Sequence, residues 1–328
     1  MATMQPERVF AHIRAGNLAL ANYESDLGLQ TSLPGTDEHW RFRFAKAECL
    51  RLRGQTGDAL ELIGTRIDAE HISPEIFALW KMHRGYVLGV RNSYLEAKQA
   101  LNEAERVAKE NQLQSVLVEI LVRRGMILFF AEDLSGSQET YREALQLAQQ
   151  QGDLFLKAVA LAGTGKNLMI RGNFHHAIDW YERALAAAQE DGARFLAATM
   201  HSELGWCYFN LNEDEKALEL FRLSETVFLE IGTLGNYQIS LGNIGNIFVR
   251  RGDYPTAITY FQRAFELAKT NEDRISMMKW LNNLSAVFTK LGNPISAEEY
   301  RRQYMRLKVE LETEREKGRC TPNKKQSA

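Results

Sequence analysis

The feature that most constrains this chain is a period of about 40 residues, which runs through nearly all of its 328 positions and is shared by three columns of residues. The first column holds turn residues at Gly16, Gly54, Asn92, Glu132, Gly172, Asn212, Gly252 and Gly292, in steps of 38, 38, 40, 40, 40, 40 and 40. The second, five positions later, holds small residues at Ala21, Ala59, Ala97, Ser137, Ala177, Ala217, Ala257 and Ala297. The third, seven positions before the turn, holds Val9, Ala47, Gly85, Gly125, Gly165, Gly205, Gly245 and Ser285. A shared period of this length predicts a stacked array of similar repeats.

The pattern within residues 241–268 predicts two helices in each repeat. One helical face carries Leu241, Ile244, Gly245 and Phe248. Gly252 and Asp253 then interrupt the pattern, and glycine readily takes the left-handed conformation at a helix end. A second face carries Ala257, Phe261 and Ala264. Because no repeat alternates apolar and polar residues with a period of two, we expect an all-α fold without strands.

The glycines inside the first helices have two interpretations. A phosphate-binding glycine loop needs a strand before it and a helix after it, and no strand precedes Gly245. Glycine inside a helix is destabilising by about 1 kcal/mol relative to alanine, which is tolerable where a partner helix packs directly against the backbone. We therefore interpret the column as a close-contact seam, in which Gly245 faces the small residue Ala257 of the second helix.

The three columns resemble the tetratricopeptide repeat, whose pattern places a large residue, Leu-Gly and Tyr on the first helix and Ala, an aromatic residue and Ala on the second. The repeats that match best carry Leu241, Ile244, Gly245, Phe248, Ala257, Phe261 and Ala264; Leu161, Thr164, Gly165, Leu168, Ala177, Tyr181 and Ala184; and Leu204, Gly205, Tyr208, Ala217 and Phe221. The match is strong from about residue 117 to 300, moderate over 78–116 and weak in the first two repeats. The long period is similar to that of kinesin light chains, of Pins-type adaptors and of bacterial arrays that precede a CHAT peptidase domain.

The resemblance implies a right-handed superhelical solenoid of about eight helix-turn-helix repeats. First helices would line a concave groove that holds a peptide or a partner helix, and stacking would bury a core that no single repeat could bury alone. We expect a degenerate repeat at 1–38, the superhelix at 39–310 and a disordered basic tail at 311–328, which is poor in apolar residues and ends basic. Residues 31–39 interrupt the array and are expected to join its first two repeats.

Composition narrows the functional classes. The net charge of −2 lacks the basic excess of a nucleic-acid binder. No apolar run approaches the roughly 18–20 residues that span a bilayer. Cys49, Cys207 and Cys320 are isolated, which fits a reducing compartment better than a disulfide framework. The first residues show no signal-peptide pattern. We therefore expect a cytoplasmic protein that binds neither nucleic acid nor membrane.

Groove-facing positions supply the candidate binding residues. The polar candidates are Asn243, Asn246, Arg250, Asn282, Asn283, Lys290 and Lys166. The aromatic candidates are Tyr86, Phe129 and Trp206. Asparagine amides can pair with a peptide backbone, the cations can meet acidic groups of a partner, and aromatic residues are enriched at interfaces. Solvated polar positions and packing between repeats remain the alternatives.

No constellation of residues predicts catalysis, a metal or a cofactor. His175 and His176 are adjacent, so on a helix they point in different directions, and no third ligand lies near them in sequence. The sequence therefore predicts a non-enzymatic scaffold for protein–protein interaction. The alternatives are a sensor array within a larger system of the CHAT peptidase or transcriptional-regulator type, an enzyme with an unrecognised site in the groove, and a self-association module that forms homo-oligomers.

Overall fold

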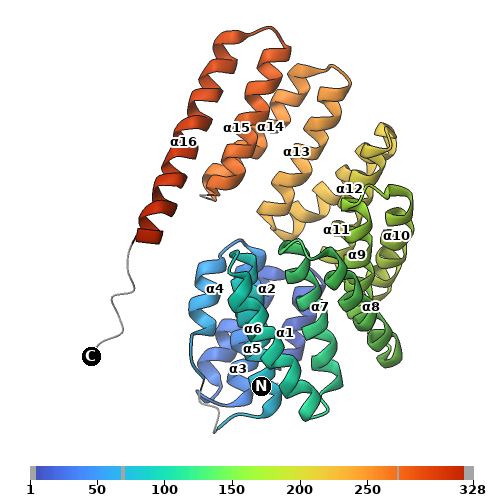
Figure 1. The fold of residues 1–328 in the computed structure, drawn as a ribbon, viewed down its shortest axis with the longest axis vertical. Helices are drawn as coiled ribbons and strands as arrows, with labels where there is room; N and C mark the ends of the chain where they lie inside the picture. Colours follow the sequence, from blue (N-terminus) through green and yellow to red (C-terminus); the bar gives the residue numbers. More distant parts are fainter. Residues whose placement is uncertain (1–4, 68–70, 272, 321–328) are drawn as a thin grey trace. The chain divides into compact units, whose positions relative to one another are not determined.

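Eight consecutive helical hairpins make up the part of the chain that the structure, a computed structural model, describes: residues 5–67, 71–271 and 273–320 (Figure 1). The described residues contain no strand, so the predicted all-α class of a helical solenoid is confirmed. The chain divides into two compact units, Met1–Thr233 and Leu234–Ala328, called here the N-terminal and C-terminal units.

The N-terminal unit contains six hairpins. Its helices are α1 (Pro6–Arg14), α2 (Leu18–Thr31), α3 (Asp37–Leu52), α4 (Thr56–Ile63), α5 (Pro74–Val90), α6 (Tyr94–Glu110), α7 (Gln114–Phe130), α8 (Leu134–Gln151), α9 (Leu154–Ile170), α10 (Phe174–Asp191), α11 (Arg194–Asn210) and α12 (Asp214–Ile231). The first helices of neighbouring repeats touch, since α5 contacts α7, α7 contacts α9 and α9 contacts α11. The odd-numbered helices therefore form an inner layer.

The C-terminal unit contains α13 (Leu234–Arg250), α14 (Tyr254–Thr270), α15 (Arg274–Lys290) and α16 (Pro294–Cys320). The expected boundary at residue 310 does not coincide with a helix end, because α16 continues to Cys320 through a stretch rich in the helix formers Glu, Arg and Lys. The rest of the expected tail, 321–328, lies outside the described residues. No described helix has the length and apolar character to cross a membrane.

Each hairpin turns at the first column of the repeat. Gly172 and Gly252 have φ values of +78° and +77°. Asn92, Glu132 and Asn212, which replace glycine in this column, take the same left-handed conformation with φ values of 66°, 64° and 62°. Asparagine is enriched in this conformation, whereas for glutamate it is uncommon. The turn geometry of the repeat is therefore kept even where the glycine is lost.

The glycine column lies against the second helix of its own hairpin, as the seam predicts. A Cβ atom on Gly245 would approach the Phe261 ring to 2.8 Å, and one on Gly205 would approach the Phe221 ring to 2.8 Å. The nearest neighbour of each of these two glycines is thus the aromatic residue of the second helix. The predicted neighbour, the small residue five positions after the turn, is farther away. Ala217 contributes only its carbonyl oxygen, 3.3 Å from the added atom at Gly205.

The N-terminal unit closes on itself. The turn after α1 reaches the end of α12, where a Cβ atom on Gly16 would meet Ile231 Cγ1 at 2.7 Å and Arg194 Cβ at 3.7 Å. Ile231 shares one buried cluster with residues of the first two repeats: Val9, Ile13, Leu18, Ala21, Phe42, Ala45 and Cys49. Repeats one and six are therefore in contact, although Gly16 and Arg194 lie 178 positions apart in sequence.

Candidate functional site

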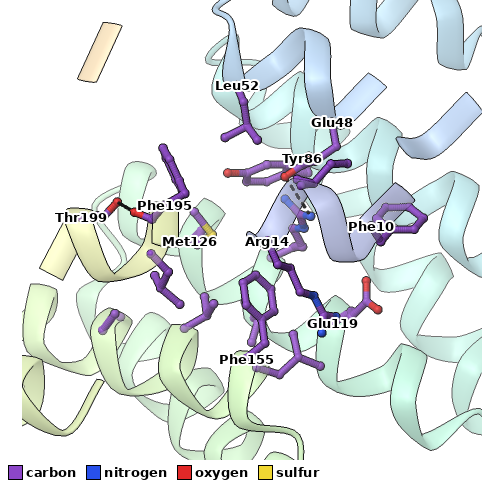
Figure 2. Close-up of a pocket in the computed structure, with 18 of the residues that line it drawn as sticks. Phe10, Arg14, Glu48, Leu52, Tyr86, Glu119, Met126, Phe155, Phe195 and Thr199 are labelled. Atoms are coloured by element: carbon purple, nitrogen blue, oxygen red, sulfur yellow. Dashed lines mark hydrogen bonds and ion pairs between the residues drawn. The ribbon is translucent and has the colours of Figure 1, made fainter. Parts of the chain in front are cut away.

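A cavity of about 820 Å³ occupies the interior of the N-terminal unit. Its walls come mainly from α1 and from the inner helices α3, α5, α7, α9 and α11, with further side chains from α8 and α10. Aromatic and other apolar side chains make up much of the lining: Phe10, Phe44, Leu52, Tyr86, Met126, Phe129, Phe130, Tyr141, Phe155, Tyr181, Phe195 and Met200. Figure 2 shows several of these side chains converging on the open space from opposite walls.

The repeat itself places many of these side chains. One column of the repeat, one position after the glycine column, contributes Phe10, Glu48, Tyr86, Met126 and Lys166, at steps of 38, 38, 40 and 40 residues. Because equivalent positions on stacked helices face the same way, this column forms a continuous strip along the wall. Sequence reasoning found Tyr86 and Lys166 but missed Phe10 and Glu48, although the same period identifies them.

Helix α1 supplies the wall that sequence reasoning did not anticipate. The guanidinium of Arg14 lies over the Phe155 ring, 4.4 Å from its centroid, and so joins α1 to α9. Figure 2 shows Arg14 and Glu119 on the same side of the cavity. Burial raises the pKa of Glu119, although Arg123 and Arg14 act in the opposite direction. The cavity is therefore enclosed by α1 of the first repeat on one side and by the inner helices of the later repeats on the other.

Two arginines share one carboxylate on the wall formed by α3, α5 and α7. Arg51 holds Glu48 with both arms of its fork, at 2.7 Å and 2.9 Å, while Arg123 Nη2 lies 3.6 Å from Glu48 Oε1. Both guanidiniums also lie over the Tyr86 ring, 5.3 Å and 4.3 Å from its centroid. Burial would raise the pKa of Glu48, but Arg51 and Arg123 outweigh burial and hold it well below its usual range. This wall carries an excess of positive charge in fixed positions.

His83 completes that wall without adding charge. It is buried and stacks on Phe44, with ring centroids 4.8 Å apart. Burial, together with the nearby Arg123, lowers the pKa of His83 to about 3. The imidazole is therefore neutral at physiological pH and contributes an aromatic surface and one hydrogen-bonding edge.

The structure divides the predicted binding residues between the two units. Tyr86, Phe129 and Lys166 line the cavity, where Lys166 Nζ pairs with Glu203 of α11 at 2.7 Å. Trp206 is half-buried on α11 and stacks on Phe209 at 5.4 Å, outside the cavity lining.

The other six predicted residues belong to the C-terminal unit. Asn243 and Asn246 lie on α13, and Asn282 and Asn283 lie on α15. Arg250 and Lys290 are exposed at the last positions of these helices. Asn243 is only 8% exposed, which makes it less accessible than a groove-facing position suggests. Their role in partner binding stays a prediction.

The adjacent histidines and the two buried cysteines are not among the residues that line the cavity. His175 and His176 are exposed on α10, and the described residues contain no group of three His, Cys, Asp or Glu side chains that could hold a metal ion. Cys49 and Cys207 are buried, and burial raises the pKa of each thiol to about 12. Their reactivity as thiolates is therefore low.

Comparison with known proteins agrees with the repeat pattern. The tetratricopeptide repeat family model matches residues 116–190 and 237–308. No curated protein sequence matches the chain. The chain therefore carries tetratricopeptide repeats in these two segments, and sixteen helices in eight hairpins with a period of 38 to 40 residues extend the same architecture along its described residues.

Solved structures share the fold at low sequence identity. A Rap protein complexed with competence and sporulation factor is 15% identical over 94% of this chain and 97% of its own, with a TM-score of 0.65. BtubC (BKLC) from P. vanneervenii is 21% identical over 73% of this chain and 96% of its own, with a TM-score of 0.58. The apo form of the quorum sensor NprR from B. thuringiensis is 13% identical over 92% and 96%, with a TM-score of 0.53.

Proposed function

We propose that this chain is a protein-interaction protein that binds a short peptide in the cavity of its N-terminal unit. The observation that carries the proposal is the cavity itself. Its volume of about 820 Å³ lies within the range of ligand-binding pockets, roughly 300–1,000 Å³. Its lining combines aromatic side chains with charged groups of both signs, so it offers a ligand both apolar surface and fixed polar partners.

A peptide suits this lining better than a purely apolar ligand. Arg51 and Arg123 present guanidinium donors, Glu119 presents a carboxyl group, and the aromatic side chains offer surfaces for apolar residues. A peptide carries groups of all three kinds. Among the similar structures, the Rap protein is complexed with competence and sporulation factor, and NprR is a quorum sensor. These names support a ligand-binding role for the shared fold.

The experiment measures binding of pools of short synthetic peptides to the full chain and to a variant with a filled cavity. Ala162 lines the cavity on α9 and is half-buried, so Ala162→Trp places a large side chain in the open space. Ala186 is exposed on α10, and Ala186→Trp is the matched control. We expect Ala162→Trp to weaken peptide binding at least about tenfold, and Ala186→Trp to leave it unchanged. A pool that binds both variants equally well contradicts the proposal.

The sensor alternative rests on a separate observation, the contact between repeats one and six. A ligand in the cavity would touch α1 on one side and α9 or α11 on the other. It would therefore favour the closed arrangement in which Gly16 meets Ile231. In this proposal, ligand binding is transmitted as a change in the closure of the N-terminal unit.

A further inference from the structure

A row of apolar residues ends four successive inner helices. Leu52, Val90, Phe130 and Ile170 are the last residues of α3, α5, α7 and α9. They occupy the same repeat position, at steps of 38, 40 and 40 residues. The same position in the next three repeats holds Asn210, Arg250 and Lys290. Apolar residues therefore occupy this position only within the N-terminal unit, and the repeat itself does not require an apolar residue there.

Three residues of the row are exposed at helix ends, whereas Leu52 is half-buried and packs against the cluster that joins repeats one, two and six. Val90 is 36% exposed, Phe130 43% and Ile170 55%, so the exposure increases from α5 to α9. Packing within the repeat does not account for these side chains. Exposed apolar side chains that lie next to one another mark interaction surfaces more often than isolated ones do. The row also adjoins the cavity, because Leu52 and Phe130 line it.

Positive charge borders the row. The residue directly after each of three of these helices is an arginine, namely Arg53, Arg91 and Arg171, and all three are exposed. Asp and Glu are absent from the three residues that follow each of α3, α5 and α9, whereas the exposed Glu132 and Asp133 follow the end of α7. A partner that covers the row therefore meets an apolar strip with an arginine at three of its four helix ends.

The geometry favours a helix as the covering element. Because α5 contacts α7 and α7 contacts α9, their axes lie about 8–10 Å apart. On an α-helix, residues one heptad apart are separated by about 10.5 Å along the axis. A helix laid across the three helix ends can thus place one apolar side chain against each of Val90, Phe130 and Ile170.

We propose that the C-terminal ends of α3, α5, α7 and α9 form a docking surface for an amphipathic helix of a partner protein, with apolar residues one heptad apart and acidic residues beside them. This surface lies at the rim of the cavity, which Leu52 and Phe130 also line, and the proposal does not depend on the ligand proposed above. A partner docked there would touch Phe130, which also lines the cavity.

The test uses a displayed library of helices in which apolar, acidic and basic residues vary at every position. The bait is the full chain, and selected helices are re-measured on variants. In Val90→Asn/Ile170→Asn, the two residues change to the one that repeat six carries at this position. Leu95→Asn is the matched control, because Leu95 is an apolar residue of α6 that is 73% exposed outside the row.

We expect selected helices to carry heptad-spaced apolar residues and an acidic excess. They should bind the double variant at least about tenfold more weakly than the full chain, and bind Leu95→Asn normally. Asn210→Ile, which extends the row onto α11, should strengthen the binding of longer helices. Phe130 is left unchanged, so peptide binding in the cavity can be measured on the same variants and should persist.

Three results overturn the proposal. The first is selection of helices that bind the double variant as well as the full chain. The second is selection of helices without the heptad or the acidic excess, or of none at all. The third is self-association of the chain that Val90→Asn/Ile170→Asn abolishes, because the row would then be covered by a second copy. Loss of cavity binding in Ala162→Trp with normal helix docking separates this surface from the peptide site.

Discussion

Gly205 illustrates how single positions in the repeat control packing. The Phe221 ring lies so close that a Cβ atom would approach it to 2.8 Å, so any side chain requires the ring or its helix to shift. The same residue type at Gly57, in α4, has no atom within 4 Å of an added Cβ. The requirement for glycine therefore comes from the neighbouring helix and not from the turn.

We predict that Gly205→Ala destabilises the fold by about 1–3 kcal/mol, because the added carbon overpacks the seam. Gly57→Ala is the control and should be neutral or stabilising by up to about 1 kcal/mol, since alanine is the better helix former. Urea unfolding followed by circular dichroism measures both. Equal stability of Gly205→Ala and the wild-type chain would show that the seam is looser than the structure indicates.

His83 gives a prediction about pH. Its pKa is about 3 in the fold against an ordinary value of 6.5, chiefly because it is buried. Between these values the unfolded chain binds a proton that the folded chain does not, so the free energy of unfolding falls as pH falls. Glu48 acts in the same direction only below its ordinary pKa of 4.5. The range from pH 7 to pH 5 therefore reports on histidines with a lowered pKa, namely His83, His39 and His201, of which His83 is the one whose pKa falls to about 3.

We expect His83 to lower the free energy of unfolding at pH 5 by about 2 kcal/mol relative to pH 7. Denaturant unfolding at the two pH values measures the difference. His83→Phe keeps an aromatic ring against Phe44 and should remove most of it, whereas His176→Phe, at an exposed position of α10, should not. A pH dependence that survives in His83→Phe would assign it to other groups.

At the scale of the helix, local pattern fixes most of the structure. The turn column and the apolar faces depend on residues a few positions apart, so the helix pairs and their turns follow from the sequence. The α1 wall of the cavity does not, because it depends on a contact between the first and sixth repeats. The burial of Asn243 could not be predicted from the repeat pattern either. Its repeat position suggested a groove-facing residue, but its burial depends on neighbours that the pattern does not specify.

The contact between repeats one and six can be tested by a disulfide. An added Cβ atom at Gly16 lies 3.7 Å from Arg194 Cβ, within the range of about 3.5–4.5 Å seen in disulfides. We expect Gly16→Cys/Arg194→Cys, in a Cys320→Ser background, to cross-link under mild oxidation and to run faster than the reduced chain on a denaturing gel. Cys49 and Cys207 are buried and should not compete.

The matched control is Gly54→Cys/Arg194→Cys. Gly54 occupies the same turn position in the next repeat, with a φ of +84° against +81° for Gly16, but has no atom within 4 Å of an added Cβ. Both variants therefore share the backbone strain of a cysteine in a glycine turn, and they differ in that only the residue at position 16 lies near Arg194 and Ile231. Equally fast cross-linking of the two pairs would contradict the closed arrangement of the N-terminal unit.

At the scale of the molecule, the cavity forms because the stacked repeats of the N-terminal unit curve around it. Each repeat adds a small rotation to the one before it, and six such rotations decide whether the first repeat meets the sixth. The side-chain volumes at every contact between helices contribute to the total rotation. The repeat pattern therefore predicted a concave surface but not its closure, and it identified three cavity residues while missing the arginines that α3 and α7 bring together.

The division into two compact units leads to a prediction about unfolding. In repeat proteins, stability is approximately the sum of repeat and interface terms, so cooperativity follows the distribution of contacts along the array. Contacts here cluster within Met1–Thr233 and within Leu234–Ala328. We therefore expect two unfolding transitions in calorimetry. Gly205→Ala should lower the midpoint of one, and Gly245→Ala, which meets Phe261 at the equivalent seam of the second unit, should lower the other. If each substitution shifts both transitions equally, the array unfolds as one cooperative block, and the boundary at Thr233 marks a change in packing without a change in stability.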